Sequence, residues 1–545
     1  MKESLLILLV IWNICCFGSY AQSKYYENSI NWLKNSENCK PSLIYKEYYP
    51  LRLVRPIKDQ MAYQGWRMED IGKVDVLFKE SLKQHSGVIL DFGEHLTGMF
   101  TFSLKILGDN VVADAPIRLK FTFAEVPSEL NTPFTPYPGS LSRAWLQDEV
   151  VTLMNVPIES SISRRVSFRY LKIDVLGASS FDFAFEKIAF KAQSAVEMLQ
   201  MDLAERTDPL IKRINEIGLC TLKECMQTVY EDGPKRDRRL WIGDLYLESL
   251  ANTYSYKNHD LTKRCLYLLA ALANDDGLLH ASVFEYPKPH PQYNQYCLDY
   301  ALIYNVALLE YLKATGDRQT AEDLWPVVVR QIEIALRQYA SDMVYDMQKP
   351  PLYWLVFDWK DNFDRHASMQ GLVIWAIENS YELAKMIGRE REVNEWPVII
   401  KKMRKSARQQ FYNREKGVIV SGPDRQISYL SQVWMILSGT LSIKEGARAL
   451  KTVMSIPDAC YPGCPYAYHY VIEALLKCGM KTEAKNLLMD YWGGMVQKGA
   501  DTFWEVYDPQ DDKKSPYGFF PINSYCHAWS CTPVYFINKY PEVFQ

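Results

Sequence analysis

The feature that most constrains the fold of this chain is a change in hydrophobic period near residue 200. After this point, apolar residues recur every three or four positions, which is typical of amphipathic helices. Glycines such as Gly316, Gly388 and Gly479 mark the ends of several of these patterns. The pattern predicts twelve helices, at about residues 207–228, 241–256, 259–273, 297–315, 317–339, 366–387, 390–412, 427–438, 443–453, 465–478, 480–493 and 524–538.

Twelve helices joined mostly as hairpins fit six helix pairs that close into a ring, an (α/α)6 barrel. An α-solenoid is the alternative arrangement, but the sequence contains no repeat of fixed period to support it. In a closed ring, the loops at one rim converge on a central pit that can enclose a ligand.

The segment from about residue 45 to 195 has the pattern of β-strands. Gly87–Gly93 is a short apolar run between turn residues, while Met99–Ile106, Ile117–Phe123 and Tyr170–Val175 alternate apolar and polar side chains. The Pro-rich stretch Thr132–Gly139 predicts a loop, because proline lacks the N–H that a strand needs. Several short strands separated by turns indicate a β-sandwich.

The N-terminus has the three parts of a secretory signal peptide. Lys2 supplies a positive charge, Leu5–Ile14 is apolar, and Ser19–Ala21 is a small-x-small cleavage site. Cys15 and Cys16 raise the alternative of a lipoprotein, which is disfavoured because Ile14 stands where a small residue is needed. The apolar run is too short to span a bilayer, and no later segment is apolar enough to do so. We therefore expect an exported protein, periplasmic or secreted, without stable membrane insertion.

At 545 residues the chain is too long for a single core, so we expect a multidomain fold. The expected parts are the signal peptide at 1–21, an N-terminal β-sandwich domain at 22–198 and an (α/α)6-barrel catalytic domain at 199–545.

The net charge and the spacing of the cysteines limit the kinds of partner, disulfide and metal site that we expect. The formal net charge is −3 with no basic cluster, so a nucleic-acid partner is not expected. Among the cysteines that follow the signal peptide, Cys460 and Cys464 flank a Pro-Gly turn and form the most plausible local disulfide. No Cys and His spacing matches a zinc site, and we expect neither a metal nor a cofactor.

Three segments place carboxylates beside tryptophans in loops rather than on amphipathic helix faces. They are Glu231–Asp244, Asp501–Asp508 with the following Ser524–Trp529, and Tyr353–Asp361. For each, the structural alternative is a salt-bridged or solvated loop beside packing aromatics. In the first, Trp241 would be costly on an open surface, and Arg and Asp side chains so interleaved can hold one another rigidly.

Other hydrolytic and nucleotide-binding motifs are missing from the sequence. It contains no G-x-S-x-G elbow, H-E-x-x-H helix, Walker loop or G-x-G-x-x-G turn. Pairs of carboxylates remain as the candidate chemistry, and such pairs are used by most glycosidases. Flat aromatic rings also suit sugars, on whose apolar faces they stack.

At these residues the sequence resembles the bacterial α-L-rhamnosidases of glycoside hydrolase family 78. Asp232–Asp244 resembles the acidic loop of that family, and Thr502–Glu505 with Ser524–His527 resembles its second carboxylate and the histidine that follows. Leu90–Glu94 and its surroundings resemble the β-domain before the family's (α/α)6 barrel. The resemblance covers nearly all of the chain after the signal peptide.

The resemblance implies a catalytic pair, in which Asp237 is the general acid and Glu505 is the general base. An inverting mechanism is implied, with roughly 6.5–9.5 Å between the two carboxyl groups. The substrate-binding residues that it implies are Asp232, Arg236, Trp241, Asp244, Trp354, Asp358, Trp359, Trp504 and His527. The implied substrate is a plant-type oligo- or polysaccharide that bears terminal L-rhamnose.

One departure from the family pattern bears on the acid. Many relatives have glutamate at this position, whereas here the loop is one residue shorter and offers Asp237. Two alternatives therefore stay open: a carbohydrate-binding protein on a degenerate glycosidase scaffold, and another toroidal glycosidase or a uronate lyase.

Overall fold

The structure, a computed structural model, describes residues 24–109, 111–177 and 179–545. The predicted signal peptide, with Cys15 and Cys16, lies outside these residues. The chain divides into two compact units. Ser42–Arg238 and Leu488–Gln545 form one, called here the sheet unit; the residues up to Pro41 and Arg239–Leu487 form the other, the helical unit. Each unit combines distant stretches of chain, so the domain boundary predicted between residues 198 and 199 stays a prediction.

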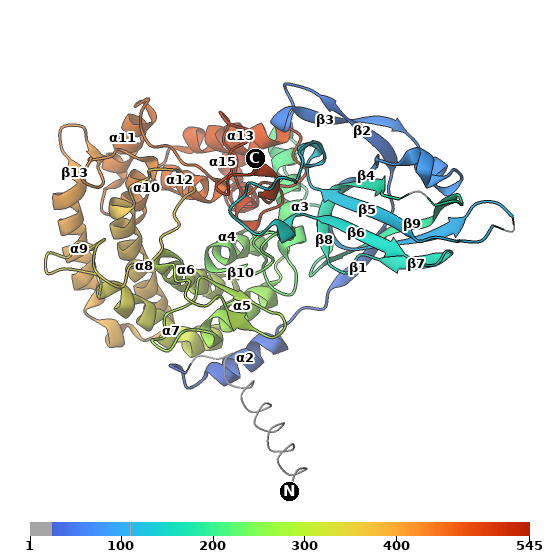
Figure 1. Ribbon diagram of the computed structural model, residues 1–545. Helices are drawn as coiled ribbons and strands as arrows, with labels where there is room; N and C mark the ends of the chain where they lie inside the picture. Colours follow the sequence, from blue (N-terminus) through green and yellow to red (C-terminus); the bar gives the residue numbers. More distant parts are fainter. Residues whose placement is uncertain (1–23, 110, 178) are drawn as a thin grey trace, which may run out of the picture. The chain divides into compact units, whose positions relative to one another are not determined.

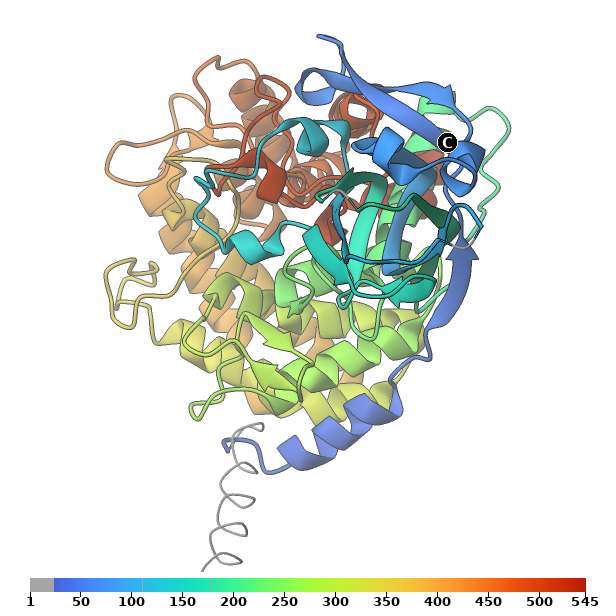
Figure 2. The ribbon, with the colours of Figure 1, turned by 45° about the vertical axis from the view of Figure 1, so that its right-hand side comes forward.

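The sheet unit contains a nine-stranded sheet in which the paired strands are antiparallel (Figure 1). The strand order is β1-β9-β4-β8-β5-β6, with the β2–β3 hairpin (blue in Figure 2) and β7 also attached to β4. The strands are β1 (Ile44–Tyr48), β2 (Arg52–Lys58), β3 (Trp66–Gly72), β4 (Val88–Ile106), β5 (Ile117–Ala124), β6 (Asp148–Leu153), β7 (Ile158–Ser161), β8 (Val166–Val175) and β9 (Phe183–Ser194). The sheet-rich N-terminal part is confirmed, with strands over Ile117–Phe123 and Tyr170–Val175 as predicted. The runs Gly87–Gly93 and Met99–Ile106 belong to the one strand β4 rather than to two short strands, and the β-sandwich stays a prediction.

The longest strand, β4, connects the two halves of the sheet. Its first part pairs with β2 and β8, and its second part pairs with β9 and β7. The register shifts between Asp91 and Leu96, where the strand is irregular. Side chains of the two halves meet in a phenylalanine-rich core, in which the rings of Phe168 on β8 and Phe190 on β9 are 4.9 Å apart. The core therefore fixes β4 on both sides of its irregularity.

Helices α3 (Pro209–Cys225), α14 (Pro533–Lys539) and α15 (Pro541–Phe544) complete the sheet unit, and α3 packs against α14. The prediction of a helix from residue 524 is wrong, because α14 begins only at Pro533. Residues Ser524 and His527 instead hydrogen-bond through their backbones to Glu505 and Phe503. The aromatic and apolar residues of this segment imitate a helical period without forming a helix.

The helical unit consists of successive helices in two layers (Figure 1). Helices α4, α6, α8, α10 and α12 contact one another in this order, while α5, α7, α9 and α11 pack against them. Helix α6 is buried nearly all round, whereas α9 and α11 bury only one stripe, as inner and outer helices do. The helices are α2 (Ser29–Asn38), α4 (Ile242–Thr253), α5 (His259–Ala271), α6 (Leu298–Thr315), α7 (Arg318–Leu336), α8 (His366–Ile387), α9 (Trp396–Phe411), α10 (Tyr429–Leu437), α11 (Ile443–Met454) and α12 (Pro465–Lys477).

Helix α13 (Lys481–Gln497) passes from the helical unit into the sheet unit. Each of the twelve predicted helices overlaps an observed one, while α2 and α15 were not predicted. Within the described residues, no helix has both the length and the apolar character that a membrane crossing requires.

The predicted disulfide between Cys460 and Cys464 is wrong, because both residues are free cysteines. Cys464 is buried, and its thiol donates a hydrogen bond to the carboxylate of Asp358. The spacing in the sequence gave no sign of this competing partner.

Candidate functional site

The acidic loop, defined here as residues 232–238 of the sheet unit, forms a tight turn. Its end returns to its beginning, because the N–H of Arg238 donates to the carbonyl oxygen of Gly233 at 3.2 Å. A side-chain carbon at Gly233 would lie 2.5 Å from the Ser524 hydroxyl oxygen, so only glycine allows this approach. The N–H of Ala528 donates to the Asp232 carbonyl oxygen at 2.8 Å. The loop is therefore bound to the chain that carries the predicted histidine.

The paired segments, defined here as residues 502–505 and 524–527, lie side by side in the same unit. The N–H of Glu505 donates to the Ser524 carbonyl oxygen, and the N–H of His527 donates to the Phe503 carbonyl oxygen, each at 2.9 Å. The Thr502 hydroxyl adds a bond of 2.7 Å to the Tyr525 carbonyl oxygen. These bonds bring together Glu505 and His527, two of the residues in the predicted site.

Arg236 connects the acidic loop to the paired segments. Its guanidinium group is almost fully buried; Nη2 donates to Oε2 of Glu505, and Nε donates to the Ile522 carbonyl oxygen at 3.0 Å. Nη1 lies 3.5 Å from Oδ1 of Asp237. The two predicted catalytic carboxylates therefore contact different nitrogens of one guanidinium group.

The environment of Glu505 favours its ionised form. Its carboxylate also accepts hydrogen bonds from the Tyr517 hydroxyl at 2.5 Å and from the Ser524 N–H at 3.1 Å. Burial alone would raise the pKa of Glu505, but the charge of Arg236 and these hydrogen bonds lower the pKa below its usual 4.5. A carboxylate held in this way can accept a proton but is unsuited to supply one near neutral pH.

Asp237 is more accessible than Glu505, with 16% of its side chain exposed against 2%. Its neighbour His527 is buried, and burial lowers the pKa of this imidazole to about 4. The ring is therefore neutral at neutral pH and can donate or accept a hydrogen bond. His527 Nε2 lies 4.0 Å from Oδ2 of Asp232, and its ring packs 4.3 Å from that of Trp529.

Trp504 has a packing role in the structure. Only 1% of the residue is exposed, and its ring stacks on that of Tyr63 at 3.8 Å. The substrate contact predicted for Trp504 is not tested by this packing and stays a prediction.

In the helical unit, three of the predicted residues form a row of indoles. The ring centroids of Trp241 and Trp354 are 6.4 Å apart, and those of Trp354 and Trp359 are also 6.4 Å apart. Trp354 is 41% exposed, so the row reaches the surface of this unit. The sequence suggested no direct contact among these three residues, and the structure brings them together.

Asp244 lies in the first turn of α4, at the helix start that the sequence predicted. The residue is 2% exposed. Next to it, a side-chain carbon at Gly243 would lie 2.3 Å from the ring of Tyr300, so glycine is required for this contact. Burial, followed by the charge of Asp244, raises the pKa of the Tyr300 phenol.

Asp358 is buried rather than solvated. Both of its carboxylate oxygens accept from the N–H of Gly463, at 2.9 and 2.8 Å, and burial raises its pKa to about 6. This geometry supports the turn before α12, and the predicted contact with substrate stays a prediction. In the described part of the chain, no group of three or more His, Cys, Asp or Glu side chains is arranged to hold a metal ion.

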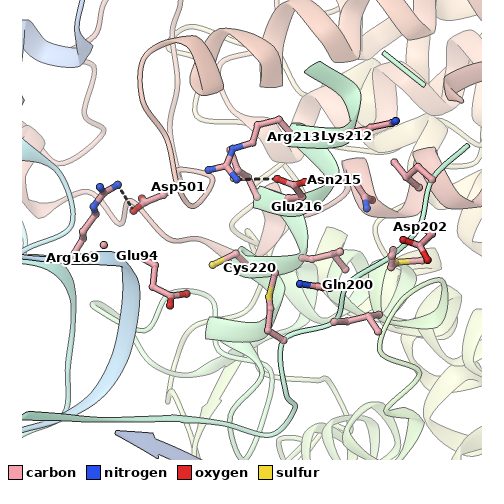
Figure 3. A pocket seen from close by; sticks show the side chains of 17 residues that line it. Glu94, Arg169, Gln200, Asp202, Lys212, Arg213, Asn215, Glu216, Cys220 and Asp501 are labelled. Atoms are coloured by element: carbon pink, nitrogen blue, oxygen red, sulfur yellow. Dashed lines mark hydrogen bonds and ion pairs between the residues drawn. The ribbon is translucent and has the colours of Figure 1, made fainter. Parts of the chain in front are cut away.

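A cavity of about 610 Å³ lies in the sheet unit (Figure 3). Its lining includes an ion pair between Arg169 and Asp501 at 3.1 Å and another between Arg213 and Glu216 at 3.0 Å. The cavity is lined by none of the predicted site residues and by no aromatic side chain. The lining of the cavity therefore includes neither the predicted pair Asp237 and Glu505 nor the flat rings that suit a sugar.

Several residues at the site were missed from the sequence. Tyr517 lies in an irregular polar segment, and Glu125 and Lys235 are a strand end and a loop lysine without a recognisable motif. Trp529 was noted only as part of its segment, yet its indole N–H donates to the Glu505 carbonyl oxygen at 3.0 Å. The sequence carried no signal for these contacts, because the partners are 12 or more positions apart and share no motif.

Comparisons with known families match nearly the whole described chain. Residues 50–192 match the glycosyl hydrolase family 78 α-rhamnosidase N-terminal domain, and residues 203–540 match the bacterial α-L-rhamnosidase six-hairpin glycosidase domain. No match was found among curated proteins.

Solved structures of rhamnosidases have the same fold. A rhamnosidase from Klebsiella oxytoca with rhamnose bound is 36% identical, with a TM-score of 0.89 over 94% of this chain and 99% of that one. A family 78 rhamnosidase of Bacillus sp. GL1 is 21% identical, with a TM-score of 0.69 over 83% of this chain and 46% of that one. A Streptomyces avermitilis α-L-rhamnosidase complexed with L-rhamnose is 14% identical, with a TM-score of 0.62 over 92% and 44% of the two chains.

Proposed function

This chain belongs to glycoside hydrolase family 78, the family of the bacterial α-L-rhamnosidases, and we propose from this that it removes terminal α-L-rhamnose as an exo-acting, inverting hydrolase. We propose plant-type oligo- or polysaccharides that bear terminal L-rhamnose as its substrates. The rhamnose bound to the Klebsiella relative supports the choice of sugar. The observation that carries the proposal is the buried Arg236, whose guanidinium group contacts both Asp237 and Glu505.

In the proposed mechanism, Asp237 donates its proton to the glycosidic oxygen as the bond from that oxygen to the anomeric carbon breaks. Glu505 accepts a proton from the water that attacks the anomeric carbon from the opposite face. The products are β-L-rhamnose and the free hydroxyl group of the leaving group. The lowered pKa of Glu505 keeps this carboxylate ionised near neutral pH, as a group that accepts a proton must be. A water fits between the carboxyl groups if they are roughly 6.5–9.5 Å apart.

We further propose that Asp232, Arg236 and His527 bind sugar hydroxyls. A buried neutral imidazole and a buried guanidinium group offer directional hydrogen bonds that lose little to solvent. The contacts of Trp241, Asp244, Trp354, Asp358, Trp359 and Trp504 with substrate are proposed from the family resemblance.

Two further proposals concern architecture and location. The match to a six-hairpin domain supports an (α/α)6 barrel formed by the helices after residue 203. The charged, apolar and small residues at 1–21 support export to the periplasm or the medium. Sequencing the N-terminus of the mature protein tests export, and a start at Gln22 is the expected result.

The test of function is hydrolysis of an aryl α-L-rhamnoside, followed by proton NMR. We expect release of rhamnose, with the β anomer formed first and the α anomer appearing later by mutarotation. Early α anomer would contradict inversion. Binding of rhamnose in a calorimeter without any turnover would instead support a carbohydrate-binding protein, and an unsaturated product absorbing in the ultraviolet would support a lyase.

A further inference from the structure

One carboxylate of the sheet unit contacts both segments that carry the proposed catalytic pair. Glu125 follows β5 directly, and its side chain is completely buried. Its Oε2 atom accepts a hydrogen bond from the N–H of Tyr525 at 2.7 Å and lies 3.0 Å from Nζ of Lys235. Lys235 belongs to the acidic loop and Tyr525 to the paired segments. A single oxygen atom therefore joins the two.

Each of these contacts is close to a catalytic residue along the chain. Lys235 stands two positions before Asp237, and its buried Nζ also donates to Glu129 at 2.7 Å. Tyr525 follows Ser524, whose backbone binds both the carboxylate and the N–H of Glu505. A shift of the Glu125 side chain would therefore be expected to move both Asp237 and Glu505.

The other oxygen of Glu125 is fixed from the sheet. Its Oε1 accepts a hydrogen bond from Ser167 on β8 at 3.3 Å and lies 3.0 Å from Nε2 of His95 on β4. On its far side, His95 Nδ1 lies 3.8 Å from Glu224 of α3, which pairs with Lys223 at 2.7 Å. Charges of opposite sign thus alternate from α3 through the sheet to the acidic loop.

These contacts keep Glu125 ionised although it is buried. Burial would raise the pKa of Glu125, but Lys235, followed by His95, lowers it to about 2. Burial would lower the pKa of His95, but its electrostatic interaction with Cys526 and then its hydrogen bonds with Glu125 and Glu224 raise the pKa well above 6.5. Both groups are therefore charged at neutral pH. A buried ion pair adds little stability compared with apolar packing, so a role in orientation is a better account of this cluster.

We propose that Glu125 is a positioning residue, which sets the placement of Asp237 relative to Glu505 by binding Lys235 and Tyr525 through one oxygen. The inference rests on the proposed function, since it assigns the reaction to these two carboxylates. It makes the N-terminal sheet a contributor to catalysis. A misplacement of about 1 Å in reacting groups can cost on the order of 100-fold in rate.

The test compares Glu125→Gln with Glu224→Gln. Both variants replace a buried carboxylate that contacts His95, but within the described part of the chain Glu224 pairs with Lys223 and His95 rather than with the acidic loop or the paired segments. For Glu125→Gln we expect kcat on an aryl α-L-rhamnoside to fall about 100-fold, with KM changing less than about threefold. For Glu224→Gln we expect kcat within about twofold of the wild type. The proposal would be overturned if both variants lost kcat to the same extent and the loss in each followed its fall in Tm.

A measurement without turnover separates this inference from the proposed function. Hydrogen exchange followed by mass spectrometry should show faster exchange at residues 232–238 and 524–527 in Glu125→Gln, and unchanged exchange there in Glu224→Gln. Wild-type protein that releases no rhamnose would refute the proposed function alone. Unchanged exchange of both segments in Glu125→Gln would refute the positioning role alone.

A second variant covers the case in which Glu125→Gln folds poorly. Because Lys235 also binds Glu129, the variant that combines Glu125→Gln with Glu129→Gln and Lys235→Met leaves no unpaired charge among these three residues, so we expect Tm to recover while kcat stays low. Recovery of kcat together with Tm would show that Glu125 acts only through stability and would overturn the inference.

Discussion

Arg236 donates a hydrogen bond to the carboxylate of Glu505, which lies 269 positions further along the chain, and both side chains are almost completely buried. A buried carboxylate without a cation would tend to take up a proton, because burial disfavours its charge. Arg236 therefore keeps Glu505 ionised. It also approaches Asp237, so the protonation of one carboxylate and the orientation of the other depend on the same side chain.

Removing the cation should destabilise the sheet unit. Arg236→Met leaves Glu505 buried without its main partner, and breaking a buried pair in this way costs about 3–5 kcal/mol of unfolding free energy. The double variant Arg236→Met with Glu505→Gln should recover part of this loss, because no unpaired charge remains. Urea unfolding of the wild type, both single variants and the double variant measures the coupling. Additive effects would contradict the pairing.

The two carboxylates should differ in their dependence on the leaving group. Asp237→Asn removes the proton donor, so kcat should fall about 10²–10⁴-fold on a natural rhamnoside and much less on an activated aryl rhamnoside. Glu505→Gln should lose activity on both, because attack by water is needed in either case. Kinetics on the two substrates measure this difference. Wild-type activity in either variant on the natural rhamnoside would remove that residue from its proposed role.

Much of the fold followed from local pattern. Helices such as α6 and α8 have long apolar runs with a glycine after the last turn, so the predicted ranges nearly coincide with the observed ones. The helix predicted from residue 524 failed because Ser524 and His527 bond to residues about twenty positions earlier. Such pairing competes with helix formation but leaves no trace in the hydrophobic period.

The candidate site was predictable only where residue types were unusual. Asp232, Arg236 and Asp237 stand out in one short loop, and Glu505 stands out between aromatics. Glu125 does not stand out, since a glutamate at the end of a strand is ordinary in sequence. Its importance comes from burial and from contacts across 400 positions to Tyr525, which only the folded chain reveals.

Gly233 should not tolerate a side chain. Gly233→Ala would place a carbon 2.5 Å from the Ser524 hydroxyl oxygen and 2.6 Å from the Arg236 carbonyl oxygen. The acidic loop must then move away from the paired segments, and we expect kcat to fall at least about tenfold, since reacting groups tolerate little displacement. Gly177→Ala, at a glycine with open space around it, is the control for Tm and kcat. Equal activity of the two variants would contradict the close approach.

The fall of kcat/KM at low pH, the acid limb of the pH profile, should reflect protonation of Glu505. Because its pKa is lowered, kcat/KM should stay high down to a pH below 4.5 and fall as Glu505 takes up a proton. The ionised form of Glu505 also stabilises the fold. This contribution is present at a pH above the ordinary pKa of 4.5 and is lost as the pH falls through the lowered pKa of the folded state. Tyr517→Phe removes a hydrogen bond that lowers this pKa, so the acid limb should move to higher pH.

The control for this variant is Tyr412→Phe, which removes a tyrosine hydroxyl that accepts a hydrogen bond from Arg448 in the helical unit. Both changes delete one oxygen, but only Tyr517 contacts a proposed catalytic group, so only Tyr517→Phe should move the limb. If the limb stays in place in Tyr517→Phe while Tm falls, the hydroxyl stabilises the fold without tuning Glu505. The limb would then have to belong to another group, because removing a donor to an ionised carboxylate raises its pKa.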